Sequence, residues 1–162
     1  MTPIIFLDFD GVVNTFIWRE YPRNPNHPQG TFHCAFAFAD DGFVNNFQAI
    51  CWLNELYRHV EYDIVVSSTW RMGHKIDELR DILYNSGLSK DIEVIGTTPV
   101  RYKKRGLEIQ EWIDSHNFTG KFCILDDDKD MEHLMPQLVW CQSNWGFGID
   151  EYSKALEILI DK

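Results

Sequence analysis

Two aspartates, Asp8 and Asp10, stand one residue apart directly after an apolar run in the stretch IIFLDFDGVVN, residues 4–14. Like charges this close repel each other, so a cation, a substrate or solvent must offset the repulsion. Further along the chain, another apolar run ends in three consecutive aspartates at 126–128. Carboxylates that converge from two strands need a hard cation, and Mg²⁺ prefers oxygen ligands of this kind.

The same carboxylates suit phosphoryl chemistry. Asp8 and Asp127 are the best candidate side-chain ligands of Mg²⁺. An aspartate is also an accepted covalent nucleophile for phosphoryl groups, which gives Asp8 a second role. Because Gly11 allows the backbone to turn away sharply, Asp10 is placed to give and take a proton while Asp8 attacks.

Hydroxyl and basic side chains elsewhere supply what a bound phosphate needs. Ser67 and Ser68 follow the apolar residues of IVVSS and can donate hydrogen bonds to a phosphate oxygen. The alternative interpretation is that both are simple turn residues. Lys103, Lys104 and Arg105 precede a predicted helix, where a cation can neutralise phosphate charge, and the three compete for that place. Positioning and electrostatics supply most of phosphoryl-transfer catalysis.

Apolar runs typical of strands alternate with helical patterns along most of the chain. Near-continuous apolar strands alternating with helices predict an α/β fold, a doubly wound parallel sheet covered on both faces. In such folds the ligand crevice lies outside the carboxyl ends of the strands, where the polar residues above are found. The expected strands are 4–9, 64–67, 92–95, 122–125 and 138–141. The expected helices cover 43–60, 76–83, 106–116 and 152–160, with Gly87 and Asn117 as helix stops.

Residues 15–42 interrupt this alternation with prolines, glycines and many aromatic residues. The segment is too small for a second domain and has the size of a flap or minimal cap over the end of the first strand. We therefore expect one domain over residues 1–162, with this flap inserted after the first strand.

Composition excludes some classes of function. The net charge of −10 argues against a broad basic surface for nonspecific nucleic-acid binding. No apolar run approaches the roughly 20 residues of a membrane span, and the N-terminal stretch lacks the basic region of a signal peptide. The four cysteines show no CxxC pairing, which favours free thiols in a reducing, cytoplasmic location.

Other polar and aromatic residues receive structural interpretations. Asp128 and Asp130 are expected to be solvated or to cap a helix. Arg71 is expected either to bind substrate or to form a surface ion pair. The tryptophans expected in the core, and not as platforms for stacking bases, are Trp70, Trp112, Trp140 and Trp145.

The order and spacing of four motifs resemble those of the haloacid dehalogenase (HAD) superfamily of phosphatases. These are DFDGV after a hydrophobic strand, IVVSS, a basic residue before a helix, and ILDDD. The resemblance covers nearly all of the chain outside residues 15–42. SSTWR, RGLEIQEWI and ILDDDKDM are most similar to a small HAD branch associated with RNA-repair proteins, and also to the phosphatase part of polynucleotide kinase-phosphatases.

The resemblance implies a role for each matching position. Asp8 would be the nucleophile that becomes an aspartyl-phosphate. Asp10 would be the general acid for the leaving group and then the base for the hydrolytic water. Ser67 would bind a phosphoryl oxygen. Asp8, the backbone carbonyl of Asp10 and Asp127 would hold Mg²⁺, with Asp126 behind them or as an alternative ligand.

The chain departs from the family pattern at several points. Val12 stands where many members have threonine, and Arg105 falls where a lysine is often found. An arginine there would neutralise charge through a planar fork. The larger cap domains of the family are absent. The open site that a minimal cap leaves suits a bulky or polymeric substrate, or a cap supplied by a partner subunit.

The expected function is therefore Mg²⁺-dependent hydrolysis of a phosphate monoester, with a nucleotide or a nucleic-acid terminal phosphate as the favoured substrate. A small phosphorylated metabolite is the main alternative. A phospho-accepting module like a receiver domain would also carry an aspartate cluster, but it lacks a second aspartate in the place of Asp10. A catalytically silent subunit would not need every carboxylate that this chain retains.

Overall fold

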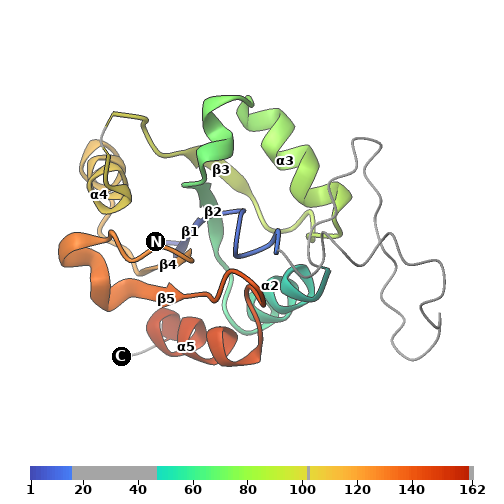
Figure 1. The fold of residues 1–162 in the computed structure, drawn as a ribbon. Coiled ribbons are helices and arrows are strands. Elements are labelled where there is room, and N and C mark those ends of the chain that lie inside the picture. Colours follow the sequence, from blue (N-terminus) through green and yellow to red (C-terminus); the bar gives the residue numbers. More distant parts are fainter. Residues whose placement is uncertain (16–46, 102, 161–162) are drawn as a thin grey trace, which may run out of the picture.

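The computed structural model describes residues 1–15, 47–101 and 103–160, which form a central parallel sheet with helices on both faces (Figure 1). The strands lie in the order β3-β2-β1-β4-β5, and every neighbouring pair is parallel. They are β1 Ile4–Leu7, β2 Asp63–Val66, β3 Val94–Thr97, β4 Phe122–Asp126 and β5 Leu138–Trp140. The helices are α2 Phe47–His59, α3 Ile76–Asn85, α4 Arg105–Ser115 and α5 Ile149–Ile160, with short 3₁₀ helices η2 Thr69–Met72 and η3 Glu132–Gln137.

The central strand β1 is buried on both faces, and its side chains alternate between two cores. Ile5 and Leu7 belong to the larger core, which α2, α3 and α5 also build. Ile4 and Phe6 point to the opposite face and pack in a smaller core with residues of α4 and η3. This two-residue alternation is the geometry of an extended strand. It confirms the predicted doubly wound α/β architecture.

The sheet has its switch point between β1 and β4. From β1 the chain builds β2 and β3 on one side, and then crosses through α4 to β4 on the other side of β1. Leu7 pairs with Leu125, so the residues that follow the two strands leave the sheet side by side. Parallel α/β sheets bind ligands at such a point, and here it receives the aspartates at 8 and 126.

The first strand ends at Leu7, two residues earlier than predicted. Asp8 turns its carboxylate back to the Phe9 backbone N–H, and the Phe9 carbonyl then accepts hydrogen bonds from the N–H groups of residues 12–14. A tight turn therefore replaces the last two strand residues.

The other predicted elements appear within two or three residues of the expected places. Gly87 and Asn117 adopt positive φ angles of 99° and 47° just after α3 and α4, which confirms them as helix stops. Of the flap expected at 15–42, all but Thr15 lies outside the described residues, as does the start of the helical pattern at 43–46. Among the described helices, none is long and apolar enough to cross a membrane.

Candidate active site

Three carboxylates meet at the switch point. Asp8, Asp126 and Asp127 each bring one carboxylate oxygen to within 4.8 Å of the others. Asp8 is only 5% exposed and Asp126 is fully buried, so bulk water does little to screen their repulsion. Three of the four residues predicted at the metal therefore come together through their side chains. The Asp10 carboxylate points elsewhere, to partners described below.

The cluster is short of positive charge. Burial and the nearby Asp8 raise the pKa of Asp126 to about 8, although Arg105 and the Asp128 backbone N–H act in the opposite direction. Burial also raises the pKa of Asp127, against a 2.7 Å hydrogen bond from the Ser143 hydroxyl. Within the described residues, Asp126 Oδ2 accepts no hydrogen bond. Three clustered carboxylates that are only partly compensated within the described residues fit a divalent cation, and their all-oxygen chemistry fits Mg²⁺.

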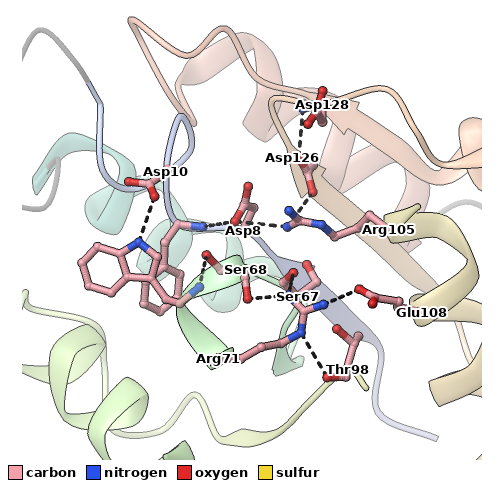
Figure 2. A network of polar contacts seen from close by, with 12 residues as sticks. Asp8, Asp10, Ser67, Ser68, Arg71, Thr98, Arg105, Glu108, Asp126 and Asp128 are labelled. Atoms are coloured by element: carbon pink, nitrogen blue, oxygen red, sulfur yellow. Dashed lines mark hydrogen bonds and ion pairs between the residues drawn. The ribbon is translucent and has the colours of Figure 1, made fainter. Parts of the chain in front are cut away.

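Arg105 is the basic residue that reaches these carboxylates. Its Nη1 lies 3.2 Å from Asp8 Oδ1 and 3.2 Å from Asp126 Oδ2, and its side chain is 12% exposed (Figure 2). Burial lowers the pKa of Arg105, but the two carboxylates outweigh it and the net shift is upward. Lys103 is exposed, and Lys104 is exposed and pairs with Glu132. Of the three competing residues, the structure places Arg105 at the cluster.

The start of α4 sets this choice. Gly106 lies against the backbone of Met131, where a Cβ atom would overlap the Met131 carbonyl. The Arg105 N–H donates to the Asp130 carboxylate at 2.9 Å, and the Gly106 N–H donates to the Asp130 carbonyl at 3.2 Å. Asp130 thus caps α4, which is one of the two roles predicted for it. The helix begins against the loop after β4, and its first side chain faces the acidic cluster.

Ser67 and Ser68 have different surroundings, although both are buried at the end of β2. The Ser67 hydroxyl has no hydrogen-bond partner among the described residues, and its backbone N–H pairs with the carbonyl of Leu7, next to Asp8. The Ser68 hydroxyl accepts a 3.4 Å hydrogen bond from the Trp70 N–H and caps η2. Ser67 therefore keeps a buried donor beside the cluster, whereas Ser68 serves the local turn.

Arg71 is buried, so its interpretation as a member of a surface ion pair is wrong. Its guanidinium pairs with Glu108 on α4, and the two side chains are only 4% and 6% exposed. It also donates to the backbone carbonyls of Ser67, Ser68 and Thr98, which are drawn in Figure 2, and to that of Pro99. Arg71 therefore ties the ends of β2 and β3 to α4. The sequence held a signal for this buried pair. Glu108 falls four residues before Trp112 on the same helix face, and a charged residue on a buried face needs a partner of opposite charge.

Asp10 lies on the opposite side of Asp8 from Arg105, and two side chains hold its carboxylate (Figure 2). The Asn14 amide donates to its Oδ1 at 2.8 Å, and the Trp70 indole N–H donates to its Oδ2 at 2.9 Å. Gly11, at φ 78°, lies directly against the Asp127 carboxylate, so the loop carrying Asp10 packs on the loop after β4. The sequence had not indicated that Trp70 contacts this aspartate.

Trp140 and Lys129 lie beside Asp127 and are called the rim below. Trp112 is buried as predicted, but the expectation of a core position is wrong for Trp140 and Trp145, which are 39% and 67% exposed. Trp140 is the last residue of β5, and its indole N–H donates to the Asp127 backbone carbonyl at 2.8 Å. The Lys129 ammonium lies 4.0 Å from the centroid of the Trp140 ring. An exposed ring and a cation thus stand one contact away from the carboxylates.

A doubly wound sheet with paired aspartates after β1, a buried hydroxyl after β2, a basic residue opening α4 and aspartates after β4 defines a HAD-type domain. The family model described as the HAD domain in Swiss Army Knife RNA repair proteins matches residues 4–151, and the chain belongs to this family. The membership confirms the resemblance on which the site roles depend, and supports a HAD-type phosphatase in general terms. No curated protein and no solved structure gives a significant match.

Proposed function

We propose that this protein is a Mg²⁺-dependent phosphatase that hydrolyses a phosphate monoester through an aspartyl-phosphate on Asp8. The observation that carries the proposal is the meeting of Asp8, Asp126 and Asp127 within 4.8 Å, with one guanidinium between two of them. An arrangement kept only for structure would gain nothing from bringing three carboxylates together, two of them buried, with one guanidinium as their partner among the described residues.

Asp8 is oriented as a nucleophile. The Phe9 N–H and the Arg105 guanidinium both contact Oδ1, at 2.8 and 3.2 Å, and this supports an attack on phosphorus by Oδ2. The bond from phosphorus to the leaving oxygen breaks as the bond to Asp8 forms, and Asp10 gives its proton to the leaving oxygen. Asp10 then takes a proton from the water that attacks the aspartyl-phosphate, which releases inorganic phosphate and restores Asp8.

The charge of the phosphoryl group is met from three directions. Arg105 presents a permanently charged fork, and the Ser67 hydroxyl is a buried donor without another partner among the described residues. Bound Mg²⁺, held by Asp8, Asp127 or Asp126, and the backbone carbonyl of Asp10, would neutralise phosphate charge and keep the carboxylates ionised. These groups are fixed by the ends of three strands and by α4, so little reorganisation accompanies the reaction.

We favour a nucleotide or a nucleic-acid terminal phosphate as the substrate. Two observations support this choice, namely membership in a family of RNA-repair HAD domains and the rim of Trp140 and Lys129 beside Asp127. An exposed indole stacks on any base, and an ammonium beside it suits the backbone phosphate. The net charge of −10 weighs against a long polymer, so a terminal nucleotide is the part that would be bound.

The test is release of inorganic phosphate from a panel of monoesters, with and without Mg²⁺. The panel contains nucleoside monophosphates, oligonucleotides with 3′- or 5′-phosphate ends, and sugar phosphates. Asp8→Asn is expected to abolish Mg²⁺-dependent release, whereas Asp128→Asn, a matched change at an exposed aspartate of the neighbouring loop, retains it. Release that persists in Asp8→Asn contradicts the proposal, and a preference for sugar phosphates replaces the favoured substrate by a small metabolite.

A further inference from the structure

Both carboxylate oxygens of Asp10 accept hydrogen bonds from side chains that cannot return them. The Asn14 Nδ2 donates to Oδ1 at 2.8 Å, and the Trp70 Nε1 donates to Oδ2 at 2.9 Å. An indole N–H is a donor only, and so is the NH₂ group of an amide. Neither of these two contacts can therefore accept the proton of a protonated Asp10. That proton is left for a different acceptor.

The two contacts differ in what they attach Asp10 to. Asn14 belongs to the same turn, since its carbonyl accepts the Gly11 N–H at 2.8 Å, and it moves together with Asp10. Trp70 stands 60 residues later in the chain, in η2 at the end of β2. The contact with Trp70 therefore fixes the turn of Asp10 to the neighbouring strand that carries Ser67.

Trp70 is held in place by its own surroundings and does not depend on Asp10 for its position. Its backbone N–H donates to the Ser68 hydroxyl, and its backbone carbonyl accepts hydrogen bonds from the backbone N–H groups of Gly73 and His74. Its ring stacks on His74 at 5.6 Å with an interplanar angle of 21° and packs against Phe9 at 5.5 Å. The donor is thus preorganised, which is what a group that aligns a catalytic side chain requires.

We propose that Trp70 is the positioning residue of the acid–base step, and that its indole N–H holds the carboxyl of Asp10 so that the proton is presented to the leaving oxygen. The inference rests on the proposed role of Asp10 as general acid. The chemistry itself is unchanged, because the proton still passes from Asp10 to the leaving oxygen and later returns from the attacking water.

The first test compares two esters in Trp70→Phe, which keeps an aromatic ring against Phe9 and His74 but removes the N–H. An aryl ester such as p-nitrophenyl phosphate has a good leaving group and needs little protonation. A nucleoside monophosphate has a poor one, because its nucleoside would leave as an alkoxide unless the acid protonates the leaving oxygen. The ratio kcat/KM reports the steps up to the aspartyl-phosphate. General acid catalysis contributes about 10²- to 10⁴-fold, so we expect kcat/KM to fall about 10-fold or more for the alkyl ester and less than about 3-fold for the aryl ester.

Trp112→Phe is the matched control, because it removes an indole N–H from a buried tryptophan of α4 on the other side of the sheet. It is expected to leave the ratio between the two esters unchanged. An equal fall for both esters in Trp70→Phe indicates a purely structural role, and no fall for either one removes the proposed contact from the mechanism. Both results overturn the inference while the proposed phosphatase stands.

The second test does not depend on catalysis. The indole N–H resonance of Trp70 is identified in a ¹⁵N correlation spectrum as the signal missing from Trp70→Phe. In Asp10→Ala this signal is expected to shift more than the other indole signals and to exchange faster with water. A Trp70 signal that does not respond refutes the contact, even if no ester is hydrolysed and the proposed function has failed on its own panel.

Discussion

Gly11 allows the two acidic loops to meet. Its φ of 78° lies in the left-handed region, and a Cβ atom there would overlap the carboxylate of Asp127. The glycine therefore serves two purposes, because it turns the chain away from β1 and leaves room for Asp127 beside Asp8.

Gly11→Ala is accordingly expected to destabilise the fold by about 1–2 kcal/mol from backbone strain and to reduce Mg²⁺-dependent hydrolysis by displacing Asp127. Gly73→Ala is the matched control, since nothing lies within 4 Å of the added atom and the backbone there is ordinary. Urea denaturation and phosphate release measure the two effects. Equal behaviour of the two variants would show that the close approach of Gly11 to Asp127 has no importance.

Trp140 allows a second prediction for a single residue. Stacking of a base on an aromatic ring is worth about 1–3 kcal/mol, so Trp140→Ala is expected to raise KM for a phosphorylated oligonucleotide by about 5- to 100-fold. Hydrolysis of p-nitrophenyl phosphate, which carries no base, should hardly change.

Trp140→Phe separates stacking from the hydrogen bond to the Asp127 carbonyl, because it keeps a ring and loses the N–H. Stacking predicts that KM in this variant stays near the wild-type value. If Trp140→Phe behaves like Trp140→Ala, the indole N–H positions Asp127 and the rim does not bind a base.

Arg71 joins three elements, and its loss is felt at all of them. The residue is buried with Glu108, and it donates to carbonyls that follow β2 and β3. Burial lowers the pKa of Arg71, against the attraction of Glu108. Removal of one partner of such a buried pair leaves the other charge uncompensated.

Arg71→Ala is expected to lower the free energy of unfolding by about 3–5 kcal/mol. The double variant Arg71→Met with Glu108→Leu should regain a large part of that loss, because no buried charge remains. Arg58→Ala, which breaks the exposed pair with Glu55, should cost less than about 1 kcal/mol. A small effect of Arg71→Ala would mean that solvent reaches Glu108 and that the connection between strands and α4 is weak.

Most of these elements could be predicted from the sequence, because the period of apolar residues determines which segments are strands and helices. The parallel sheet alone also predicts that polar residues at the strand ends lie close together. These residues are Asp8, Ser67, Asp126 and Asp127. The choice among Lys103, Lys104 and Arg105 did not follow, because the contact of Gly106 with Met131 fixes where α4 begins. The contact between Trp70 and Asp10 also joins residues 60 positions apart, and no local pattern encodes it.

Residue type alone did not predict which tryptophans are buried. Large aromatic residues are mostly buried, which made core positions the natural expectation. Trp140 ends an edge strand next to the site, and its polar N–H already has a partner in the Asp127 carbonyl, so its ring remains partly open to solvent.

At the scale of the whole molecule, we expect the acidic cluster to make the free energy of unfolding depend on both pH and Mg²⁺. In the metal-free protein, burial and Asp8 raise the pKa of Asp126 to about 8, above its unfolded value. The folded state then binds more protons than the unfolded state between these two values. The contribution of Asp126 to stability is therefore present at low pH and is lost as pH rises through about 8.

Asp126→Asn removes this titration, so the stability of the metal-free variant relative to wild type is expected to increase as pH rises from the ordinary aspartate value of 3.8 to about 8, and to stay level above that. Mg²⁺ requires ionised ligands, and its stabilisation of the wild-type protein should grow over the same range. Thermal unfolding with a chelator and then with excess Mg²⁺ measures both trends. A relative stability that stays constant across this range would contradict the electrostatic account of the site.

The central claim is that Asp8 carries the phosphoryl group during turnover. The most direct measurement is mass spectrometry of acid-quenched Asp10→Asn protein after mixing with Mg²⁺ and p-nitrophenyl phosphate, since loss of the base slows hydrolysis of the intermediate. We predict a phosphoryl group on the peptide that contains Asp8, and none when Asp8→Asn is added. Turnover of the ester by wild-type protein without any phosphorylated peptide, and with hydrolysis retained in Asp8→Asn, would contradict the mechanism.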